Sequence, residues 1–362
     1  MPGNIERKKI LILYNNLFHY RIAIFKLFAE KCDLTVAYSI GPGLIENVNF
    51  KIIKLPVIKY KRLVFHKNNI YKLCQQFDVV IAYGDIAWLK LSTLPFYKKR
   101  SFKVIFWTIG VSASYEKKYD AVSTWNSIRN FFYRRADALI FYSDYPIKGY
   151  VKRGFDAKKL FVAPNTVEVL TKLNSEIYKK DSLLFIGTLY MQKGISILLE
   201  NYKLAQSVNP DILPLNIVGG GPEYKSIQNW VQKNSLAHKI FLHGPILEIE
   251  KKAVFFYKAY ACISPIQAGL SVLESLGYGV PFITTHDALT GGERLNIQNG
   301  INGILLDDVI GLKDIILDIC GNKEKYLKMG KNAFEYYRNN RKPSDMANGL
   351  LNAVKYVLNK NE

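Results

Sequence analysis

The sequence predicts an α/β protein with two doubly wound domains, and three observations carry this prediction. The chain has 362 residues, and domains usually hold roughly 100–200 residues, so two domains with sizeable cores are expected. Its residues are 49% hydrophobic and 22% charged, which is typical of an ordinary globular protein. Short apolar runs alternate with longer amphipathic segments, a pattern that predicts parallel sheets covered by helices on both faces.

Seven short apolar segments of the N-terminal half are predicted to be strands, because β-branched and aromatic residues dominate them. These strands are 8–14, 34–38, 50–55, 79–83, 103–107, 138–143 and 160–163. The amphipathic segments between them predict helices at 20–30, 67–76, 126–136 and 146–153.

The C-terminal half repeats this alternation. Its predicted strands are 182–187, 214–218, 239–243, 259–264, 280–285 and 303–306, and its predicted helices are 193–206, 222–235, 248–257, 270–278, 309–318, 323–340 and 343–358. A polar, turn-rich stretch that follows Pro164-Asn165-Thr166 and runs to Asp181 marks the domain boundary. We therefore expect an N-terminal domain at 1–165, a second domain at 166–340 and a C-terminal helix within 341–362.

Positive charge is concentrated in the N-terminal half. Residues 1–165 hold 28 Lys and Arg against 11 Asp and Glu, a net charge of +17, whereas residues 166–362 hold 22 against 19, a net charge of +3. This asymmetry points to a polyanionic partner: nucleic acid, a phosphorylated substrate or an anionic membrane surface. The alternative is a set of solvated charges that reflect lysine-rich codon usage.

Several other classes of protein are disfavoured by the sequence. No apolar run reaches the ~18–20 residues of a membrane span, and the charged start lacks a cleavage site, so neither a spanning helix nor a signal peptide is expected. The four cysteines form no CxxC pair, which is typical of reduced thiols in the cytoplasm. The five histidines show no metal-binding spacing, and no nucleic-acid motif is present.

Ligands of open parallel sheets bind at the carboxyl ends of the strands, so the loops after the predicted strands are the candidate site. With two such domains, we expect that site in the cleft between them. The first loop of the second domain begins at Gly187-Thr188 and ends at Lys193-Gly194, which open a helix. A lysine beside the free N–H groups of a helix start suits a phosphate, although a lone solvated lysine gives the same pattern.

The next loop contains three consecutive glycines, Gly219, Gly220 and Gly221, followed by Pro222 at the first helical position. Glycine lets a ligand approach the backbone closely, and it equally suits a tight turn from strand to helix. No GxxxxGK[ST] pattern is present, so this is not a Walker A loop.

The loop before helix 270–278 is the most informative segment. The N–H groups of Leu270 and Ser271 can hold a diphosphate, and Glu274, one turn further on, can hydrogen-bond a ribose. Ser271 and Glu274 also have the spacing of a capping box, and both interpretations stay open. A further loop, Thr290-Gly291-Gly292-Glu293, follows the next strand and can face the same site.

In this order and at these distances, the motifs resemble those of the family 4 glycosyltransferases of the GT-B fold. The shared run is a strand ending in glycine, Lys-Gly, a glycine-rich turn, Ser-Pro, Gly-Leu-x-x-x-Glu and Gly-Val-Pro. The resemblance covers about 160–355, and Pro164-Asn165-Thr166 matches the family's interdomain linker. The N-terminal half matches in layout and in Phe18-His19-Tyr20-Arg21, which resembles the opening of many bacterial polysaccharide transferases.

This resemblance implies two Rossmann-like domains facing a cleft, with the C-terminal helix returning to the N-terminal domain. It implies that Lys193 contacts the donor diphosphate and Glu274 the ribose, both as catalytic residues. The implied donor-binding set is Gly187, Thr188, Lys193, Gly219, Gly220, Gly269, Leu270, Ser271, Glu274 and Glu293. On the acceptor side it suggests His19, Arg21 and Gly110. It also implies retention of anomeric configuration, no cofactor and no essential metal.

The sequence departs from the family pattern at three places. Thr188 stands where the family usually has arginine, and Ile266 stands where it usually has the first of two glutamates. An apolar residue at 266 suits a 6-deoxy sugar such as fucose or rhamnose. The histidine that often precedes the glycine of the N-terminal domain is missing from Trp107-Thr108-Ile109-Gly110.

We therefore expect a glycosyltransferase that moves a sugar from a nucleoside-diphosphate sugar to a glycan or a polyprenyl-diphosphate-linked oligosaccharide. The alternatives are a nucleotide-sugar epimerase of the same fold, a non-catalytic scaffold and, from charge alone, a nucleic-acid binder. The basic, aromatic N-terminal half predicts peripheral attachment to the anionic inner face of the cell membrane. No nucleic-acid partner is expected.

Overall fold

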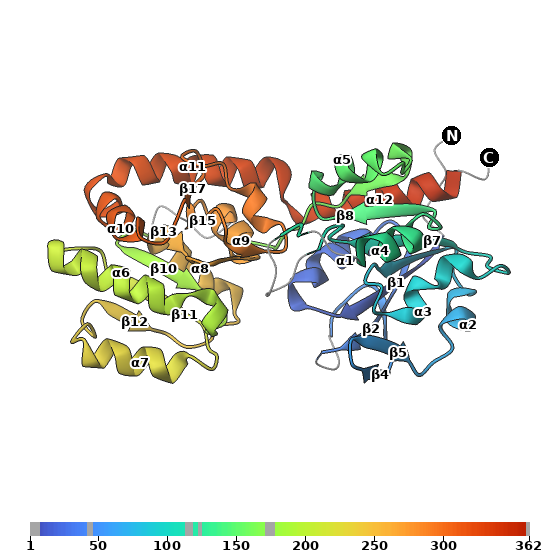
Figure 1. Ribbon diagram of the computed structural model, residues 1–362, viewed down its shortest axis with the longest axis horizontal. Helices are drawn as coiled ribbons and strands as arrows, with labels where there is room; N and C mark the ends of the chain where they lie inside the picture. Colours follow the sequence, from blue (N-terminus) through green and yellow to red (C-terminus); the bar gives the residue numbers. More distant parts are fainter. Residues whose placement is uncertain (1–7, 42–45, 113–118, 122–124, 171–177, 360–362) are drawn as a thin grey trace. The chain divides into compact units, whose positions relative to one another are not determined.

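The chain divides into two compact units (Figure 1). The computed structural model describes residues 8–41, 46–112, 119–121, 125–170 and 178–359. The N-terminal unit comprises Met1–Ser112, Asp120–Asn165 and Lys342–Glu362, and the C-terminal unit comprises Ala113–Tyr119 and Thr166–Arg341. The first seven residues, where no signal peptide was expected, and 171–177 of the expected linker lie outside the described residues.

The N-terminal unit is built on a parallel sheet of seven strands in the order β3-β2-β1-β6-β7-β8-β9. Its strands are β1 (Lys9–Asn16), β2 (Asp33–Ile40), β3 (Lys51–Lys54), β6 (Val79–Tyr83), β7 (Lys103–Thr108), β8 (Ala138–Phe141) and β9 (Leu160–Val162). All seven were predicted from the sequence. The strand order reverses next to β1, as in doubly wound folds.

Helices cover both faces of this sheet. They are α1 (Ile22–Ala29), α2 (Ile70–Cys74), α3 (Leu89–Ser92), α4 (Trp125–Tyr133), α5 (Tyr145–Lys152) and α12 (Pro343–Asn359), with short 3-10 turns η1 (His19–Arg21), η2 (Leu94–Phe96) and η3 (Ala157–Lys159). Along each strand, successive side chains alternate between faces. Ile12 and Trp107 pack under α1 and α12, whereas Leu13 and Phe106 pack with α2 and the last residue of α4.

A short antiparallel hairpin was not predicted from the sequence. It pairs β4 (Val57–Tyr60) with β5 (Leu63–His66), and Tyr60 faces Leu63 across the turn. The turn places Lys61 at a φ of 53°, an uncommon conformation for a residue with a side chain. Three basic residues in this segment hide the alternation that would have indicated strands.

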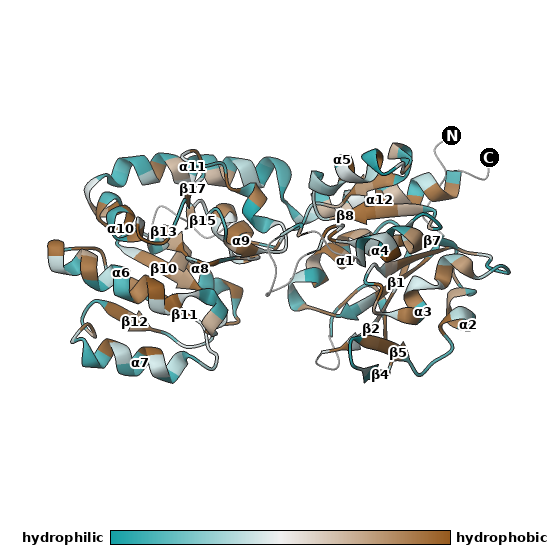
Figure 2. Cartoon of the chain, in the orientation of Figure 1, coloured by the Kyte–Doolittle hydropathy of each residue, from teal (hydrophilic) through white to brown (hydrophobic). Residues whose placement is uncertain are grey.

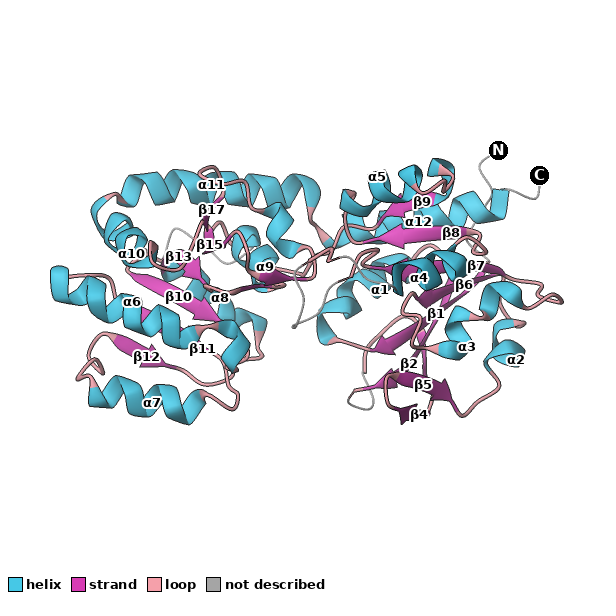
Figure 3. Cartoon of the chain, in the orientation of Figure 1, coloured by secondary structure: helices cyan, strands magenta, loops and turns pink. Residues whose placement is uncertain are grey.

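Helix α12 belongs to the N-terminal unit although it is the last element of the chain. It contacts α1, β8 and β9, and Figure 3 shows it beside β9. The approach is closest at Gly349, where a Cβ atom would clash with the carbonyl oxygen of Val162 and the Cα atom of Ala163. Glycine at this position therefore lets the helix lie directly on the end of β9.

The C-terminal unit is a second doubly wound domain with a parallel sheet in the order β12-β11-β10-β13-β15-β17. Its strands are β10 (Ser182–Ile186), β11 (Leu215–Val218), β12 (Ile240–Leu242), β13 (Ala259–Ile263), β15 (Phe282–Thr285) and β17 (Gly303–Leu306), and β14 (Gln267–Ala268) pairs with β16 (Leu289–Thr290) beside them. The order reverses between β10 and β13, which marks the switch point where such sheets bind ligands.

Helices also cover both faces of this second sheet. They are α6 (Ile195–Val208), α7 (Tyr224–Lys233), α8 (Ile249–Lys258), α9 (Ser271–Gly277), α10 (Leu312–Gly321) and α11 (Lys323–Asn340), with 3-10 turns η5 (Met191–Lys193) and η6 (Glu293–Asn296). The strands of both units are predominantly hydrophobic, whereas many helices carry one hydrophilic face (Figure 2). The predicted α/β class with two Rossmann-like halves is confirmed.

We predict that Gly349→Ala destabilises the N-terminal unit. Alanine improves helix propensity, but the clash of its methyl group with the end of β9 should outweigh that gain and cost about 1–3 kcal/mol. Urea unfolding followed by circular dichroism measures the effect. The control is Gly321→Ala, at the last residue of α10, where a Cβ atom meets nothing within 4 Å. Equal effects of the two substitutions would contradict the close docking of α12.

Candidate functional site

The predicted donor residues of the C-terminal unit lie in loops at the carboxyl edge of its sheet. Gly187 directly follows β10, and Lys193 ends the turn η5 just before α6. The helix thus begins two residues later than the sequence predicted, and Gly194 caps it in the left-handed region at a φ of 66°. Lys193 therefore precedes the helix rather than opening it.

Lys193 is buried, with a side chain only 7% exposed. Among the described residues, its ammonium group forms no hydrogen bond or salt bridge. Burial lowers the pKa of this ammonium below its usual value, and nearby Cys262 and Glu293 offset part of that shift. The Nζ atom lies close to Gly187, since a Cβ atom at 187 would stand 3.4 Å from it, in van der Waals contact.

The glycine turn after β11 packs against the loop that carries Lys193. A Cβ atom at Gly219 would clash with the carbonyl oxygen of Gly187, and one at Gly221 would clash with that of Leu189. The two loops also exchange a backbone hydrogen bond from Leu189 N–H to the Gly220 oxygen at 2.9 Å. Close packing of the two backbones thus explains why residues 219 and 221 are glycines. The helix that follows begins at Tyr224, not at Pro222 as the sequence predicted.

Glu274 on α9 forms a salt bridge with Lys252 on α8, and both side chains are largely buried. The capping-box interpretation is excluded, because Ser271 is the first helical residue and its buried hydroxyl oxygen has no hydrogen-bond partner in the part of the chain that the structure describes. Gly269, just before the helix, is open: a Cβ atom there would meet nothing within 4 Å. Lys252 is the site residue that the sequence analysis did not find.

The loop after β16 holds a second buried carboxylate. Glu293 is 8% exposed, and its Oε2 atom accepts hydrogen bonds from the N–H of Gly291 at 2.9 Å and the hydroxyl of Thr290 at 3.3 Å. Gly292, at a φ of 120°, precedes it. The carboxylate of Glu293 raises the pKa of Lys193, so the two charged groups are close enough to interact.

Comparison with known proteins identifies this part of the chain. Residues 180–322 match the family described as glycosyl transferases group 1. We call this matched segment the group 1 domain. An uncharacterized glycosyltransferase of Methanocaldococcus jannaschii is 30% identical to the chain over 159 residues, which are 42% of each protein. O-antigen chain mannosyltransferase C of Escherichia coli is 26% identical over 157 residues, 41% of this chain and 40% of the relative.

These matched segments span about two fifths of the curated relatives. Likeness to solved structures extends further: HepE of Anabaena, in complex with UDP, covers 96% of this chain and 99% of its own, with a TM-score of 0.71 at 15% identity. At that identity the likeness concerns the fold. The chain has the GT-B fold, as the sequence analysis predicted.

Two departures from the family pattern fall inside the group 1 domain. Thr188 is exposed beside Gly187. Ile266 packs on the Lys193 loop, since a Cβ atom at Gly194 would lie 2.5 Å from its Cγ1 atom. The neighbouring Gln267 accepts a hydrogen bond from the hydroxyl of Tyr190 at 2.6 Å. An apolar side chain therefore stands where the family usually has a carboxylate.

The suggested acceptor-side residues lie in the N-terminal unit, near the carboxyl ends of its strands. His19 stands in η1 with its ring 5.6 Å from that of Tyr20. Arg21 is buried, where it donates to Asn165 at 2.8 Å and contacts the Met346 sulfur of α12. These contacts give Arg21 a structural role.

The structure also explains why residue 110 is a glycine. Its φ is 83°, and a Cβ atom there would lie 2.6 Å from the ring of Phe141. Its carbonyl oxygen accepts a hydrogen bond from Tyr150 at 2.9 Å. Substrate contact by His19, Arg21 or Gly110 stays a prediction.

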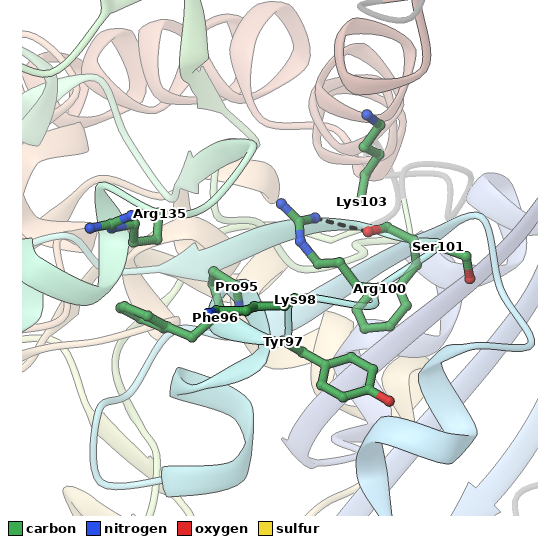
Figure 4. Close-up of a pocket in the computed structure, with 9 residues that line it drawn as sticks. Pro95, Phe96, Tyr97, Lys98, Arg100, Ser101, Lys103 and Arg135 are labelled. Carbon is green, nitrogen blue, oxygen red and sulfur yellow. Dashed lines mark hydrogen bonds between the residues drawn. The ribbon is translucent and has the colours of Figure 1, made fainter.

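A surface cavity of about 600 Å³ lies elsewhere, in the N-terminal unit (Figure 4). It is lined by Pro95, Phe96, Tyr97, Lys98, Arg100, Ser101, Phe102, Lys103 and Arg135. None of these residues was predicted to bind the donor. Within the described ranges, no three His, Cys, Asp or Glu side chains gather so as to hold a metal ion.

We predict that the ion pair between Lys252 and Glu274 stabilises the group 1 domain. Lys252→Met should leave a buried carboxylate without its partner and cost about 1–3 kcal/mol. In a double-mutant cycle with Glu274→Gln, urea unfolding should give a coupling free energy between Lys252 and Glu274 of about 1 kcal/mol or more. The control is Lys251→Met, whose partner Glu248 is well exposed and whose loss should cost under about 0.5 kcal/mol. A coupling near zero would contradict the prediction.

Proposed function

We propose that this protein is a retaining glycosyltransferase, which moves a hexose or deoxyhexose from a nucleoside-diphosphate sugar to a glycan or lipid-linked oligosaccharide in surface polysaccharide biosynthesis. One observation carries the proposal: the ammonium group of Lys193 is buried at the end of β10 without a hydrogen bond or salt bridge among the described residues. A buried charge is costly unless it is paired. A donor diphosphate bound there supplies the missing negative charge.

The same group serves the chemical step. When the bond between sugar and diphosphate breaks, negative charge grows on the leaving phosphate. A cation that is already desolvated and fixed stabilises this charge more in the transition state than in the bound donor. Lys193 is held in a short turn between β10 and α6, so little reorganisation is required.

Further residues of the group 1 domain complete the proposed donor site. Glu274, oriented by Lys252, binds the ribose, and the backbone N–H groups of Gly269, Leu270 and Ser271, at the start of α9, bind the phosphates. The unpartnered hydroxyl of Ser271 is available to donate to a phosphate oxygen. Glu293, held by Gly291 and Thr290, lies in the electrostatic environment of Lys193 and accepts hydrogen bonds from hydroxyls of the donor sugar.

The relatives support this class of donor and acceptor. HepE of Anabaena was also solved in complex with UDP-glucose, and the Escherichia coli relative is an O-antigen chain mannosyltransferase. The apolar Ile266 favours a sugar with fewer hydroxyls, such as a 6-deoxy sugar, over one that needs a carboxylate at this place. Retention of configuration is checked by proton NMR of the first product formed.

We also propose that the protein works in the cytoplasm, attached to the inner face of the cell membrane, where a polyprenyl-diphosphate-linked acceptor would be presented. The net charge of +17 over residues 1–165 supports this placement, because an anionic leaflet attracts basic surfaces. No described helix is long and apolar enough to cross a bilayer.

We predict that the protein releases a nucleoside diphosphate from one member of a nucleotide-sugar panel, and that Lys193→Ala slows turnover by roughly 10²-fold or more, because it removes charge stabilisation from the transition state. Lys203→Ala, at an exposed lysine of α6, is the matched control and should keep full activity. Release from no donor would favour a non-catalytic scaffold. Full activity in Lys193→Ala would remove this lysine from the mechanism.

We predict that the reaction needs no divalent metal, since the Lys193 ammonium and the N–H groups near Ser271 are proposed to neutralise the diphosphate. Turnover should stay within about twofold after dialysis against EDTA. A metal that acted as the main electrophile would be worth several kcal/mol, so its removal would lower turnover far more than twofold. Loss of activity on chelation, restored by Mg²⁺ or Mn²⁺, would show instead that a metal carries the phosphate charge.

A further inference from the structure

Helix α4 exposes an apolar stripe on the N-terminal unit. Trp125, Ile128 and Phe131 recur at every third residue, and they are 50%, 44% and 56% exposed. Residues at this spacing share one side of a helix. Three large apolar side chains in one exposed row are unusual on a surface that faces only water.

The last turn of α4 anchors the helix to the sheet, and its first turn is bonded to the loop after β7, where the Ser112 hydroxyl donates to the Asn126 side-chain oxygen at 3.1 Å. Tyr133 is the buried residue of α4, and its hydroxyl donates to the Gly84 carbonyl oxygen and contacts the Thr108 hydroxyl at 2.9 Å. An amphipathic helix normally packs its apolar side on the core. Here the anchor fixes the helix while Trp125, Ile128 and Phe131 stay outside.

The apolar row continues onto the neighbouring turn η2. The rings of Phe131 and Phe96 are stacked with centroids 5.3 Å apart, and the Phe132 ring meets that of Phe96 edge-on at 5.7 Å. The guanidinium of Arg135 lies 5.7 Å from the centre of the Phe96 ring. We call Trp125, Ile128, Phe131 and Phe96 the α4 surface.

Basic residues border the α4 surface. Lys98, Lys99, Arg134 and Arg135 are exposed, and neither 94–101 nor 125–136 contains an acidic residue. Arg100 is paired with Asp137 at 2.5 Å, and the other basic residues of these two segments, Lys98, Lys99, Arg129, Arg134 and Arg135, carry the net positive charge. The cavity of about 600 Å³ opens beside Phe96 and is lined by Lys98, Lys103 and Arg135 as well as Arg100 (Figure 4).

We propose that the α4 surface docks on an anionic phospholipid membrane, with α4 lying in the plane of the interface. Trp125, Ile128 and Phe131 enter the boundary between head groups and acyl chains, where amphipathic helices and tryptophan side chains are stable. Lys98, Lys99 and Arg135 contact lipid phosphates, and the cavity accepts one head group. This inference rests on the proposed membrane attachment and names the surface that performs it.

Charge complementarity favours an anionic membrane as the partner of the α4 surface. A protein partner of an apolar row would be matched by neutral or acidic surroundings, whereas every charged residue within 94–101 and 125–136 is basic. Basic residues near an anionic leaflet attract it over a distance set by the salt concentration. Docking is therefore expected to require both the apolar row and the basic border.

The experiment is co-sedimentation of the full chain with vesicles of phosphatidylcholine alone, or of phosphatidylcholine and phosphatidylglycerol in equal parts. Binding is expected only to the anionic vesicles and should weaken as salt is added. The triple variant Trp125→Ser, Ile128→Ser, Phe131→Ser should bind at least about tenfold more weakly, because it removes most of the inserted apolar area. A second triple variant replaces three basic residues of the border: Lys98→Gln, Lys99→Gln, Arg135→Gln. It should bind the anionic vesicles more weakly, and its binding should depend less on salt.

Matched controls come from the C-terminal unit. Leu247→Ser, Ile301→Ser, Ile310→Ser removes three apolar side chains that are 83%, 52% and 79% exposed, and Lys203→Gln, Lys225→Gln, Lys233→Gln removes three exposed lysines. Both control variants should bind as the unchanged protein does. Equal losses in control and test variants would overturn the proposal, as would binding to neutral and anionic vesicles alike, or to neither.

Trp125 provides a readout that does not depend on a variant's folding. Trp88 and Trp107 are buried and Trp230 is half-buried with its ring N–H bonded to Glu200, so Trp125 is the exposed tryptophan. Its emission should shift to the blue on anionic vesicles and be quenched by brominated lipid, and Trp125→Phe should abolish both effects. Vesicle binding without quenching would place the contact on another surface and overturn the proposal.

Two further outcomes are distinguishable. A dimer in sedimentation velocity that the triple serine variant dissolves, with no vesicle binding, would mean that a second copy of the chain covers the row, and the proposal would fail. Vesicle binding through Trp125 in a protein that cleaves no nucleotide-sugar would support the docking surface while the proposed transferase function failed. The proposed docking surface and the proposed transferase function can therefore fail independently.

Discussion

The loops that follow β10 and β11 approach each other so closely that no side chain fits between their backbones. A methyl group at Gly219 or Gly221 would overlap the carbonyl oxygen of Gly187 or Leu189. This contact, with the hydrogen bond from Leu189 to Gly220, fixes the course of the loop before α6. The loop in turn ends in η5 and holds Lys193 at the end of the sheet. The proposed donor site depends on this packing of glycine backbone.

The position of Lys193 has an electrostatic consequence. Its ammonium is taken out of water, so burial lowers its pKa, and Glu293 compensates only in part. A bound diphosphate would restore the charged form, and the cation would then stabilise the leaving group without having to lose water first. The ion pair of Lys252 with Glu274 holds the second proposed contact in the same unit, one carboxylate oriented by one lysine. The donor site thus combines one charge that is compensated only in part with one paired charge.

Much of this could be predicted from the sequence, because the signals were local. Buried parallel strands are continuous apolar runs, and all thirteen strands of the two main sheets were found from them. The hairpin of β4 and β5 was missed, since its basic residues break the alternation. Lys252 was missed because its partner lies on another helix, twenty-two residues away. Ser271 and Glu274 fitted a capping box by spacing, and the helix start at Ser271, together with its unbonded hydroxyl among the described residues, excluded it.

The most direct test of the central claim is a calorimetric titration that separates the diphosphate from the rest of the nucleotide. A nucleoside diphosphate that binds, chosen from UDP, GDP and TDP, and its parent nucleoside are titrated into the unchanged protein and into Lys193→Ala. If Lys193 holds the diphosphate, the variant binds the diphosphate about tenfold or more weakly, as expected for a hydrogen bond between charged groups, and binds the nucleoside equally well. An equal loss for both ligands, or no loss for either, would contradict the account.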